Sequence, residues 1–188
     1  MTTSRIAPLV APFAPDVERA LTAMMPAGVP PIALFRTFAK NLPMAEAMRG
    51  WGRYELGRSL SLTMRDRELV IDRTCARCGC EYEWGVHIAF FAERVGLTAE
   101  QVTSLTHGSS LDACRTAARD RLLIDAADAL HDDADIDDQL WADLAATFTE
   151  PELLDLLALA GWYHAISFVG RAARVPLEEG APTFASVR

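Results

Sequence analysis

The sequence lacks several features that would assign it to particular classes of protein. It contains no cluster of Lys and Arg, and its 26 acidic residues against 18 basic ones give a net charge of −8. Because nucleic acids and anionic membrane surfaces attract basic patches, we expect neither as a partner. No apolar run approaches the roughly 18 consecutive residues that would indicate a membrane-spanning helix, so we expect none.

The amino terminus and the cysteine content exclude two further classes. Residues 1–8 have neither the basic stretch nor the unbroken apolar core of a signal peptide, and we therefore expect a cytoplasmic protein. Four cysteines among 188 residues are too sparse for a disulfide scaffold. Three of the four lie within six positions, which indicates reactive or metal-binding thiols more than structural bridges.

Strand patterns are also missing from the sequence. No stretch alternates apolar and polar residues between hairpin turn residues, and no repeat with a period of about 20–50 residues is present. Gly and Pro instead divide the chain into segments with helical spacing. The sequence therefore predicts an all-α fold, a single-domain helical bundle of about seven or eight helices. With 51% hydrophobic residues, the chain can form one core.

Capping signals predict where several helices begin. A Thr followed three residues later by Asp, Gln or Glu matches the capping box, in which each residue satisfies a backbone N–H of the other. The pattern occurs three times, at Thr63 with Asp66, Thr98 with Gln101, and Thr149 with Glu152.

Glycine and acidic residues predict further boundaries. Gly79 marks a break before a long helix over residues 80–95, which Gly96 is expected to close. Asp112 is expected to cap an amphipathic helix that reaches about residue 130. The acidic residues 132–138 are expected to form a solvated connector. The helix that begins after Thr149 is apolar nearly all round, which is typical of a core or interface helix.

The chemically richest stretch runs from Thr74 to His87 and reads Thr-Cys-Ala-Arg-Cys-Gly-Cys-Glu-Tyr-Glu-Trp-Gly-Val-His. On a helix that turns about 100° per residue, Cys80, Glu83 and His87 fall within a sector roughly 60° wide. Each adjacent pair can therefore touch. Cys80 would lie near the start of the helix, where the helix dipole favours a thiolate.

Four interpretations of this stretch remain open from its residues alone. Glu83 and His87 could form a proton-transfer pair with Cys80 nearby. Cys75 and Cys78, or Cys80 with a neighbour, could form a redox dithiol. Cys75, Cys78, Cys80 and His87 could bind zinc, although their spacing does not match the common zinc patterns. The stretch could also be a helix with an exposed Glu–His pair and buried cysteines that act as small apolar residues.

Several other residues are expected to have structural or solvated positions. Trp84 and His164 are expected to be core or interface residues. Cys114 is expected to be a small buried residue. His107 and His131 fall at expected loop or helix ends, where solvation accounts for them.

Two segments together resemble a known family. The first is Arg65-Asp-Arg-Glu68-Leu-Val-Ile, and the second is Cys80-Glu-Tyr-Glu83-Trp-x-x-His87. Their residues and spacing resemble the carboxymuconolactone decarboxylase and alkylhydroperoxidase-D-like superfamily, as do the upstream residues 34–43 and 60–63. The resemblance implies an all-α homo-oligomer whose active sites lie near subunit contacts.

One position departs from the peroxidase branch of this superfamily. That branch has a Glu, eleven residues, and then Cys-x-x-Cys-x-x-x-His, in which the second cysteine attacks the peroxide. Glu68, Cys80 and His87 match this pattern, but Glu83 stands in place of the attacking cysteine. A carboxylate cannot be oxidised to a sulfenic acid or form a disulfide. The resemblance therefore implies the branch in which Glu and His transfer protons.

The resemblance implies a cofactor-free lyase or isomerase for a small organic acid or lactone, with no metal. Glu68, Glu83 and His87 would transfer protons, and Cys80 would be accessory. The first alternative is a thiol peroxidase that uses Cys80 with Cys78 or Cys75, and the second is a non-catalytic oligomeric binding protein. An acidic substrate would need cations, and those close in sequence are Arg65, Arg67, Arg73 and Arg77.

The expected organisation of the chain has three parts. Residues 1–29 form an N-terminal arm with a short helix, residues 30–175 form the carboxymuconolactone decarboxylase-like domain, and residues 176–188 form an irregular tail.

Overall fold

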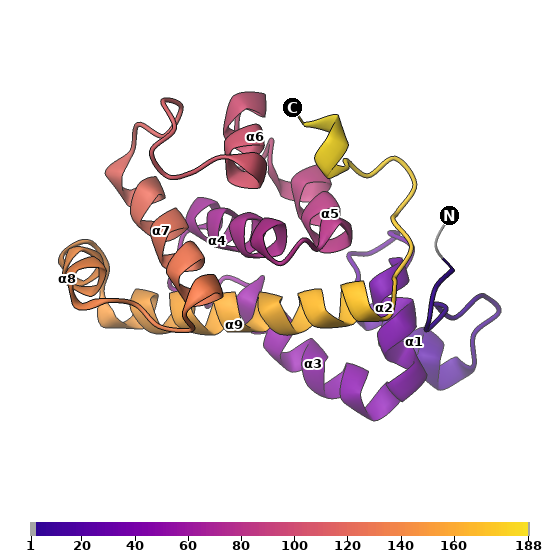
Figure 1. The fold of residues 1–188 in the computed structure, drawn as a ribbon. Helices are drawn as coiled ribbons and strands as arrows, with labels where there is room; N and C mark the ends of the chain where they lie inside the picture. Colours follow the sequence, from indigo (N-terminus) through magenta and orange to yellow (C-terminus); the bar gives the residue numbers. More distant parts are fainter. Residues whose placement is uncertain (1–2, 188) are drawn as a thin grey trace.

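Helices account for the regular secondary structure of residues 3–187, the part of the chain that this computed structural model describes (Figure 1). No strand occurs in that part, so the predicted all-α class is confirmed. Residues 3–187 contain nine α-helices, slightly more than expected. Their bounds are α1 Pro15–Met24, α2 Ala33–Phe38, α3 Leu42–Glu55, α4 Met64–Arg77, α5 Glu81–Phe91, α6 Ala99–His107, α7 Ala118–Asp132, α8 Asp138–Thr147 and α9 Glu150–Ala172. Two 3₁₀ segments, η1 Ala39–Asn41 and η2 Phe184–Ser186, complete the set.

The three predicted capping boxes begin α4, α6 and α9, as expected. In each of them the third helical residue and the capping Thr exchange hydrogen bonds, which satisfies backbone donors that the first helical turn leaves free. The observed bonds are Asp66 N–H to Thr63 Oγ1 at 3.1 Å, Gln101 N–H to Thr98 Oγ1 at 3.2 Å, and Thr149 N–H to Glu152 Oε2 at 2.8 Å.

The turn between α4 and α5 is closed by Gly79, which has a φ of +65°. The Cys80 N–H donates to the Cys75 carbonyl at 2.8 Å, and the Gly79 N–H donates to the Ala76 carbonyl at 2.9 Å. This pair of bonds is the Schellman motif that ends many helices. As a result α4 runs further than predicted, and Cys80 precedes the first turn of α5 instead of lying within it.

The predicted start of α7 at Asp112 is wrong. Residues 108–117 form an irregular connection, in which the Asp112 carboxylate accepts the Ser109 N–H at 3.1 Å and caps no helix. The connection folds over the buried Arg115, whose Nε donates to Ser104 Oγ at 3.2 Å. Cys114 in this connection is half-buried, not buried as predicted.

The core is built around α4, which packs against α5, α6, α7 and α9. Figure 1 shows α4 in the middle of the molecule, with α9 running along one side and α1–α3 gathered at one end. Trp84 is fully buried in this core, as predicted. A second apolar cluster joins α2 to the start of α5 and the end of α9, and includes Leu34, Phe38 and Ile166.

The 23-residue helix α9 is long and apolar enough to cross a membrane by length and composition alone. Half of its most apolar window is buried inside the molecule, where the helix packs against α4, α5, α7 and α8. This is the position of a core helix, which the sequence predicted.

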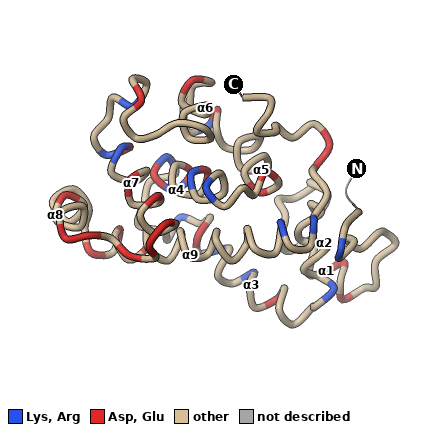
Figure 2. The backbone as a smooth tube through the Cα atoms, in the orientation of Figure 1, with Lys and Arg blue, Asp and Glu red and all other residues tan. Residues whose placement is uncertain are grey.

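The acidic connector and the C-terminal tail lie at opposite sides of the core. Residues 132–138 are mostly exposed, as predicted, and Figure 2 shows acidic residues gathered around the α7–α8 end. The tail folds back onto α5, where Glu81 Oε1 accepts the Phe184 N–H at 2.8 Å. The rings of Phe184 and Trp84 lie 5.0 Å apart. The tail therefore braces the helix that carries Glu83 and His87.

Candidate active site

A cavity of about 450 Å³ lies between the N-terminal helices α1–α3 and the pair α5 and α9. Its wall is largely apolar, with side chains such as Phe35 and Phe90. The polar side chains in the wall are Glu83 and His87, one helical turn apart on α5, and Tyr163 on α9. Two arginines of α3 also line it, Arg49 and Arg53.

Behind the cavity wall, α4 presents a buried carboxylate to the histidine. Glu68 Oε2 lies 2.8 Å from His87 Nδ1, and Arg67 Nε donates to Glu68 Oε1 at 2.7 Å. Glu68 is 0% exposed and Arg67 is 3% exposed. The two oxygens of Glu68 are thus divided between a guanidinium and an imidazole, which fixes the histidine ring.

On the cavity side, His87 Nε2 lies 3.5 Å from Glu83 Oε1 and 3.1 Å from the Tyr163 hydroxyl. Burial alone would lower the pKa of His87, but the charge and hydrogen bond of Glu68, followed by those of Glu83, raise it to about 10. The ring is therefore an imidazolium at neutral pH. Its Nδ1–H donates to Glu68, and its Nε2–H points toward Glu83 and Tyr163.

The other two polar groups of the wall have complementary roles. Burial, together with the charges of Glu83 and Glu68, raises the pKa of Tyr163 well above its ordinary value, so the phenol stays protonated. Its oxygen can accept from His87 while its O–H remains a donor. Glu83 Oε2 has no hydrogen-bond partner among residues 3–187, although it is buried. A carboxylate oxygen of this kind can accept a proton from a bound molecule.

A third carboxyl group, Asp72, lies one turn beyond Glu68 on α4. Burial, followed by the charge of Glu68, raises the pKa of Asp72 well above its ordinary value, although His87, Arg115 and Arg67 act in the opposite direction. Oxygens of Glu68 and Asp72 and a nitrogen of His87 lie within 4.8 Å of one another, as in a metal site. Arg67 and His87 already occupy the two oxygens of Glu68, whereas Asp72 Oδ1 has no hydrogen-bond partner among residues 3–187.

Cys80, expected as an accessory group, does not line the cavity. It is 1% exposed, and its Sγ faces α9 so closely that a Cβ added to Gly170 would lie 3.1 Å away. Burial raises the pKa of the Cys80 thiol, and this effect outweighs the hydrogen bond from the start of α5 that lowers it. The expected thiolate is therefore absent. Cys75 is fully buried in α4, and burial raises its pKa well above the ordinary value.

The suggested zinc set of Cys75, Cys78, Cys80 and His87 does not assemble. Among residues 3–187, none of these three thiols belongs to a group of potential ligands with His87. The reason is the turn at residues 78–80, which sends the Cys78 side chain toward α7, where its Sγ lies 3.7 Å from His131 Nδ1.

The arginines near the motif in sequence are engaged elsewhere, whereas the cavity takes its cations from α3. The neighbouring arginines pair with carboxylates as Arg65–Asp120 at 2.7 Å, Arg67–Glu68 at 2.5 Å, Arg73–Asp128 at 2.6 Å and Arg77–Asp132 at 2.5 Å. Sequence reasoning missed Arg49, Arg53 and Tyr163. No local pattern marks them, because only the packing of α3 and α9 against α5 brings them to the cavity.

Comparisons with known proteins agree with this architecture. The model of the carboxymuconolactone decarboxylase family matches residues 44–124, which include Glu68, Glu83 and His87. The crystal structure of the debrominase Bmp8 aligns with a TM-score of 0.70 at 17% identity, covering 93% of this chain and 92% of that one. An uncharacterised peroxidase-related protein from Silicibacter sp. TM1040 aligns with a TM-score of 0.75 at 16% identity, covering 100% of both chains.

A cysteine-to-alanine variant of Bmp8, in complex with 2,3,4-tribromopyrrole, aligns with a TM-score of 0.71 at 18% identity and covers 95% of this chain and 94% of that one. No curated protein matches the sequence. At these identities the likeness to solved structures establishes the fold.

Proposed function

From the family-model match over residues 44–124, we propose that the chain is a cofactor-free acid/base enzyme of the carboxymuconolactone decarboxylase family, a lyase or isomerase acting on a small organic acid or lactone. One observation carries this proposal. An imidazolium, His87, is held between Glu68 and Glu83 in the wall of a cavity, and Cys75 and Cys80 do not line that cavity.

The geometry supports a division of labour between the side chains in the wall. Glu83, with one unpartnered oxygen, is placed to take a proton from a carbon next to a carbonyl group. His87 and Tyr163 supply the donors that stabilise the enolate oxygen as charge develops on it. Glu68 and Arg67 are positioning residues, which hold the ring and its proton from behind.

This set of groups serves both reaction types. In an isomerisation, Glu83 removes a proton from one carbon of the substrate, and the proton returns to another carbon of the conjugated system. In a decarboxylation, the electron pair of the breaking C–C bond moves into the unsaturated carbonyl system and CO₂ leaves. A proton from His87, or a solvent proton that Glu83 has taken up, then completes the product. Neither reaction requires an external oxidant or reductant.

The lining of the cavity supports a substrate that combines an apolar body with an anionic group. Aromatic and aliphatic side chains form most of the wall, and Arg49 and Arg53 add two guanidinium groups to the imidazolium of His87. A carboxylate can bind these guanidinium groups while the unsaturated ring or chain lies toward His87. The ligand of the Bmp8 variant, a small halogenated aromatic molecule, is likewise largely apolar.

The alternatives receive less support. A thiol peroxidase needs an accessible thiolate, whereas the Cys80 thiol is buried with a raised pKa, outside the cavity. A non-catalytic binding protein would not need an ionised histidine beside an unpartnered carboxylate. The room next to Glu83 and His87 also favours a site that admits a ligand.

The proposal can be tested with a panel of small unsaturated lactones and carboxylic acids, assayed for CO₂ release and double-bond migration. We expect turnover by the wild type and by a variant with all four cysteines replaced by alanine. We expect loss of at least about a hundredfold in kcat for Glu83→Gln, the usual scale of a general acid or base. Glu93→Gln, which changes an exposed glutamate just beyond α5, is the matched control and should leave kcat unchanged.

A second assay separates this proposal from the peroxidase alternative. Hydroperoxide consumption is measured with a dithiol reductant for the wild type and for Cys80→Ser. We expect no consumption above background in either protein. Consumption by the wild type that Cys80→Ser abolishes would overturn the proposal in favour of thiol chemistry.

A further inference from the structure

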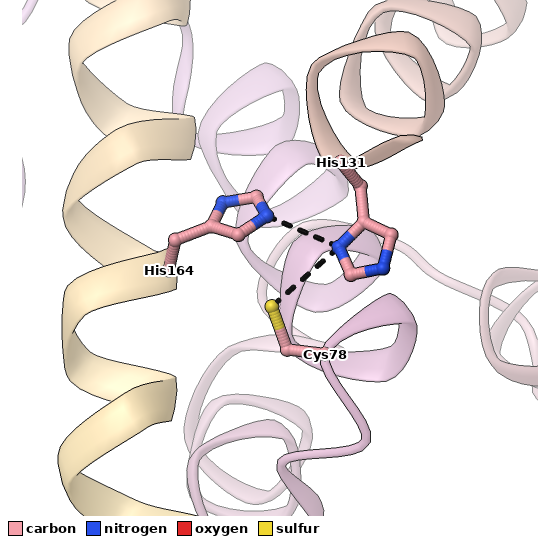
Figure 3. A group of neighbouring side chains, drawn as sticks. All are labelled: Cys78, His131 and His164. Atoms are coloured by element: carbon pink, nitrogen blue, oxygen red, sulfur yellow. Dashed lines mark hydrogen bonds between the residues drawn. The ribbon is translucent and has the colours of Figure 1, made fainter. Parts of the chain in front are cut away.

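Three side chains outside the cavity converge on one point of the molecule. Cys78 comes from the end of α4, His131 from the last turn of α7 and His164 from the middle of α9 (Figure 3). The Sγ of Cys78 lies 3.7 Å from His131 Nδ1, and His131 Nδ1 lies 3.1 Å from His164 Nε2. All three potential ligand atoms lie within 4.8 Å of one another.

These separations are close to the edges of a zinc coordination tetrahedron. With Zn–S of about 2.3 Å and Zn–N of about 2.0–2.1 Å, tetrahedral angles place sulfur and nitrogen about 3.6 Å apart and two nitrogens about 3.3 Å apart. The observed 3.7 Å and 3.1 Å differ from these values by only a few tenths of an ångström. Two of the three edges therefore match, and the third, between the ligand atoms of Cys78 and His164, is no longer than 4.8 Å.

The histidine of α9 has the outer hydrogen bond that metal-binding histidines usually make. His164 Nδ1 lies 2.8 Å from the Ala160 carbonyl, so Nδ1 carries the hydrogen and donates it. The lone pair of neutral His164 is therefore on Nε2, the atom that faces His131. A backbone carbonyl of this kind fixes both the tautomer and the ring orientation of metal ligands.

The surroundings allow a metal ion to arrive. His131 and His164 are half-buried, whereas Cys78 is 6% exposed, so the thiol lies beneath the imidazoles. A thiol binds a metal ion as its thiolate, so binding would release protons.

We propose that Cys78, His131 and His164 form a binding site for a zinc-type transition-metal ion, separate from the acid/base centre. One thiolate and two imidazoles suit Zn²⁺ and disfavour the hard ions Mg²⁺ and Ca²⁺. The protein supplies three ligands, so the fourth position is left to water or a small anion. None of the three residues lines the cavity that contains Glu83 and His87. This site was not expected from sequence, where His131 and His164 had structural roles.

The site would tie together three helices that are distant in sequence. Cys78 directly precedes the glycine turn that leads into α5, and His131 and His164 belong to α7 and α9. A bound ion would therefore stabilise the folded protein in proportion to its concentration and affinity.

The test is calorimetric titration of Zn²⁺ into chelator-treated full-length protein, with Co²⁺ as a spectroscopic probe. We expect one ion per chain, released protons, and a thiolate-to-Co²⁺ charge-transfer band in the near ultraviolet. Because three ligands share the ion, His131→Gln, His164→Gln and Cys78→Ser should each weaken binding at least tenfold, and Cys78→Ser should abolish the band.

The matched controls are Cys114→Ser and His107→Gln, which change a thiol and an imidazole outside the cluster and should leave both readouts unchanged. If Cys78→Ser does not fold, His131→Gln, which changes a half-buried side chain, is the variant that tests the site. The proposal is overturned if the wild type binds no stoichiometric ion. It is equally overturned if Co²⁺ binds without the charge-transfer band, or if binding survives His131→Gln unchanged.

Discussion

At the scale of single residues, the ionisation of His87 determines what the site can do. Two carboxylates flank the ring, and they raise its pKa from 6.5 to about 10 against the opposing effect of burial. Nitrogen chemical shifts of the ring should therefore report an imidazolium at pH 8, with a midpoint near pH 10. Glu68→Gln removes the closest carboxylate and should lower that midpoint. A ring that is neutral at pH 8 in the wild type would contradict the proposed role as an acid.

The same shift has a consequence for stability. The pKa of His87 is higher in the folded protein than in the unfolded chain. The stabilisation that the imidazolium gains from its two carboxylates is therefore fully present below about pH 6.5. It is lost as the pH rises through about 10. Glu68→Gln should therefore reduce the difference in the free energy of unfolding between pH 6 and pH 10.

Glu55 provides a second residue-scale prediction, in a lower pH range. Neither of its carboxylate oxygens has a hydrogen-bond partner among residues 3–187, and burial, followed by the charge of Asp155, raises its pKa from 4.5 to about 7. Stability should therefore fall as the pH rises from 4.5 to 7. Glu55→Gln should raise the free energy of unfolding at pH 8 by on the order of 2 kcal/mol, with little effect at pH 5.

Urea unfolding at the two pH values measures this effect. Glu46→Gln, at an exposed position on the same helix, is the control and should change neither value. An equal effect of Glu55→Gln at pH 5 and pH 8 would show that the carboxylate does not titrate in this range.

Residue by residue, the sequence predicted only what local spacing determines. Glu83 and His87 meet because they are one turn apart on one helix, and Glu68 joins them through the adjacent helix. Tyr163 contacts His87 across 76 positions of sequence, and no local pattern indicates such a contact. Cys80 was misplaced because the glycine turn removes it from the helix on which its orientation was predicted.

At the scale of elements, the contact between α5 and the C-terminal tail is the most sensitive to substitution. A Cβ added to Gly85 would lie 2.5 Å from the Pro182 carbonyl oxygen, so one of the two backbones must move. Gly85→Ala should therefore displace the tail and destabilise the protein by about 1–3 kcal/mol, the usual cost of overpacking. The measurement is the free energy of unfolding, followed by tryptophan fluorescence because Trp84 packs on the tail.

A glycine on α3 offers the matched control. A Cβ added to Gly50 would meet nothing within 4 Å, and helix propensity favours Ala over Gly by about 0.5–1 kcal/mol. Gly50→Ala should therefore be neutral or stabilising. If the two variants had the same effect, the tail would not be packed tightly against α5.

Helix boundaries were predictable where a capping side chain fixes the first turn. They were not predictable where the burial of a distant side chain determines where the helix begins. The three capping boxes needed only the capping Thr and the residue three positions on. The start of α7 was not predicted, because Arg115 is buried against α6 and the residues around it form an irregular connection. The helix therefore begins at Ala118, about two turns after the expected start. The contacts of the C-terminal tail were likewise not predictable from the sequence, because they join residues about a hundred positions apart.

At the scale of the whole molecule, α9 presents an apolar stripe on its outer side. Leu154 is 68% exposed and Phe168 is 66% exposed, and the small residues Gly161 and Ala165 are exposed between them. At about 100° per residue these four positions fall within a sector roughly 60° wide. Small residues flanked by large apolar ones allow a second helix to approach closely, so we propose that the chain self-associates through this stripe.

Self-association through α9 can be measured by sedimentation. We expect the wild type to sediment as an oligomer and Phe168→Glu to sediment as a smaller species. Leu111→Glu changes a more exposed leucine on the irregular connection, away from this stripe, and should leave the oligomer intact. A monomeric wild type would contradict the proposal.

The whole-molecule fold was the part most fully predicted, because helical spacing and the family resemblance agree on an all-α bundle. The position of the cavity was not predictable, since it arises where α1–α3 fold against α5 and α9. That packing also supplies Arg49 and Arg53, which add two guanidinium groups to the cavity wall.

The proposed centre as a whole is tested most directly by exchange of carbon-bound hydrogen with solvent. Small unsaturated lactone acids are incubated with the protein in D₂O and followed by proton NMR, which detects the delivery of a solvent-derived deuteron to carbon in both the lyase and the isomerase reaction. We expect deuterium incorporation with the wild type and with the variant lacking all four cysteines, and its loss in Glu83→Gln. Incorporation that survives Glu83→Gln, or that disappears with the cysteines, would contradict acid/base catalysis at Glu83 and His87.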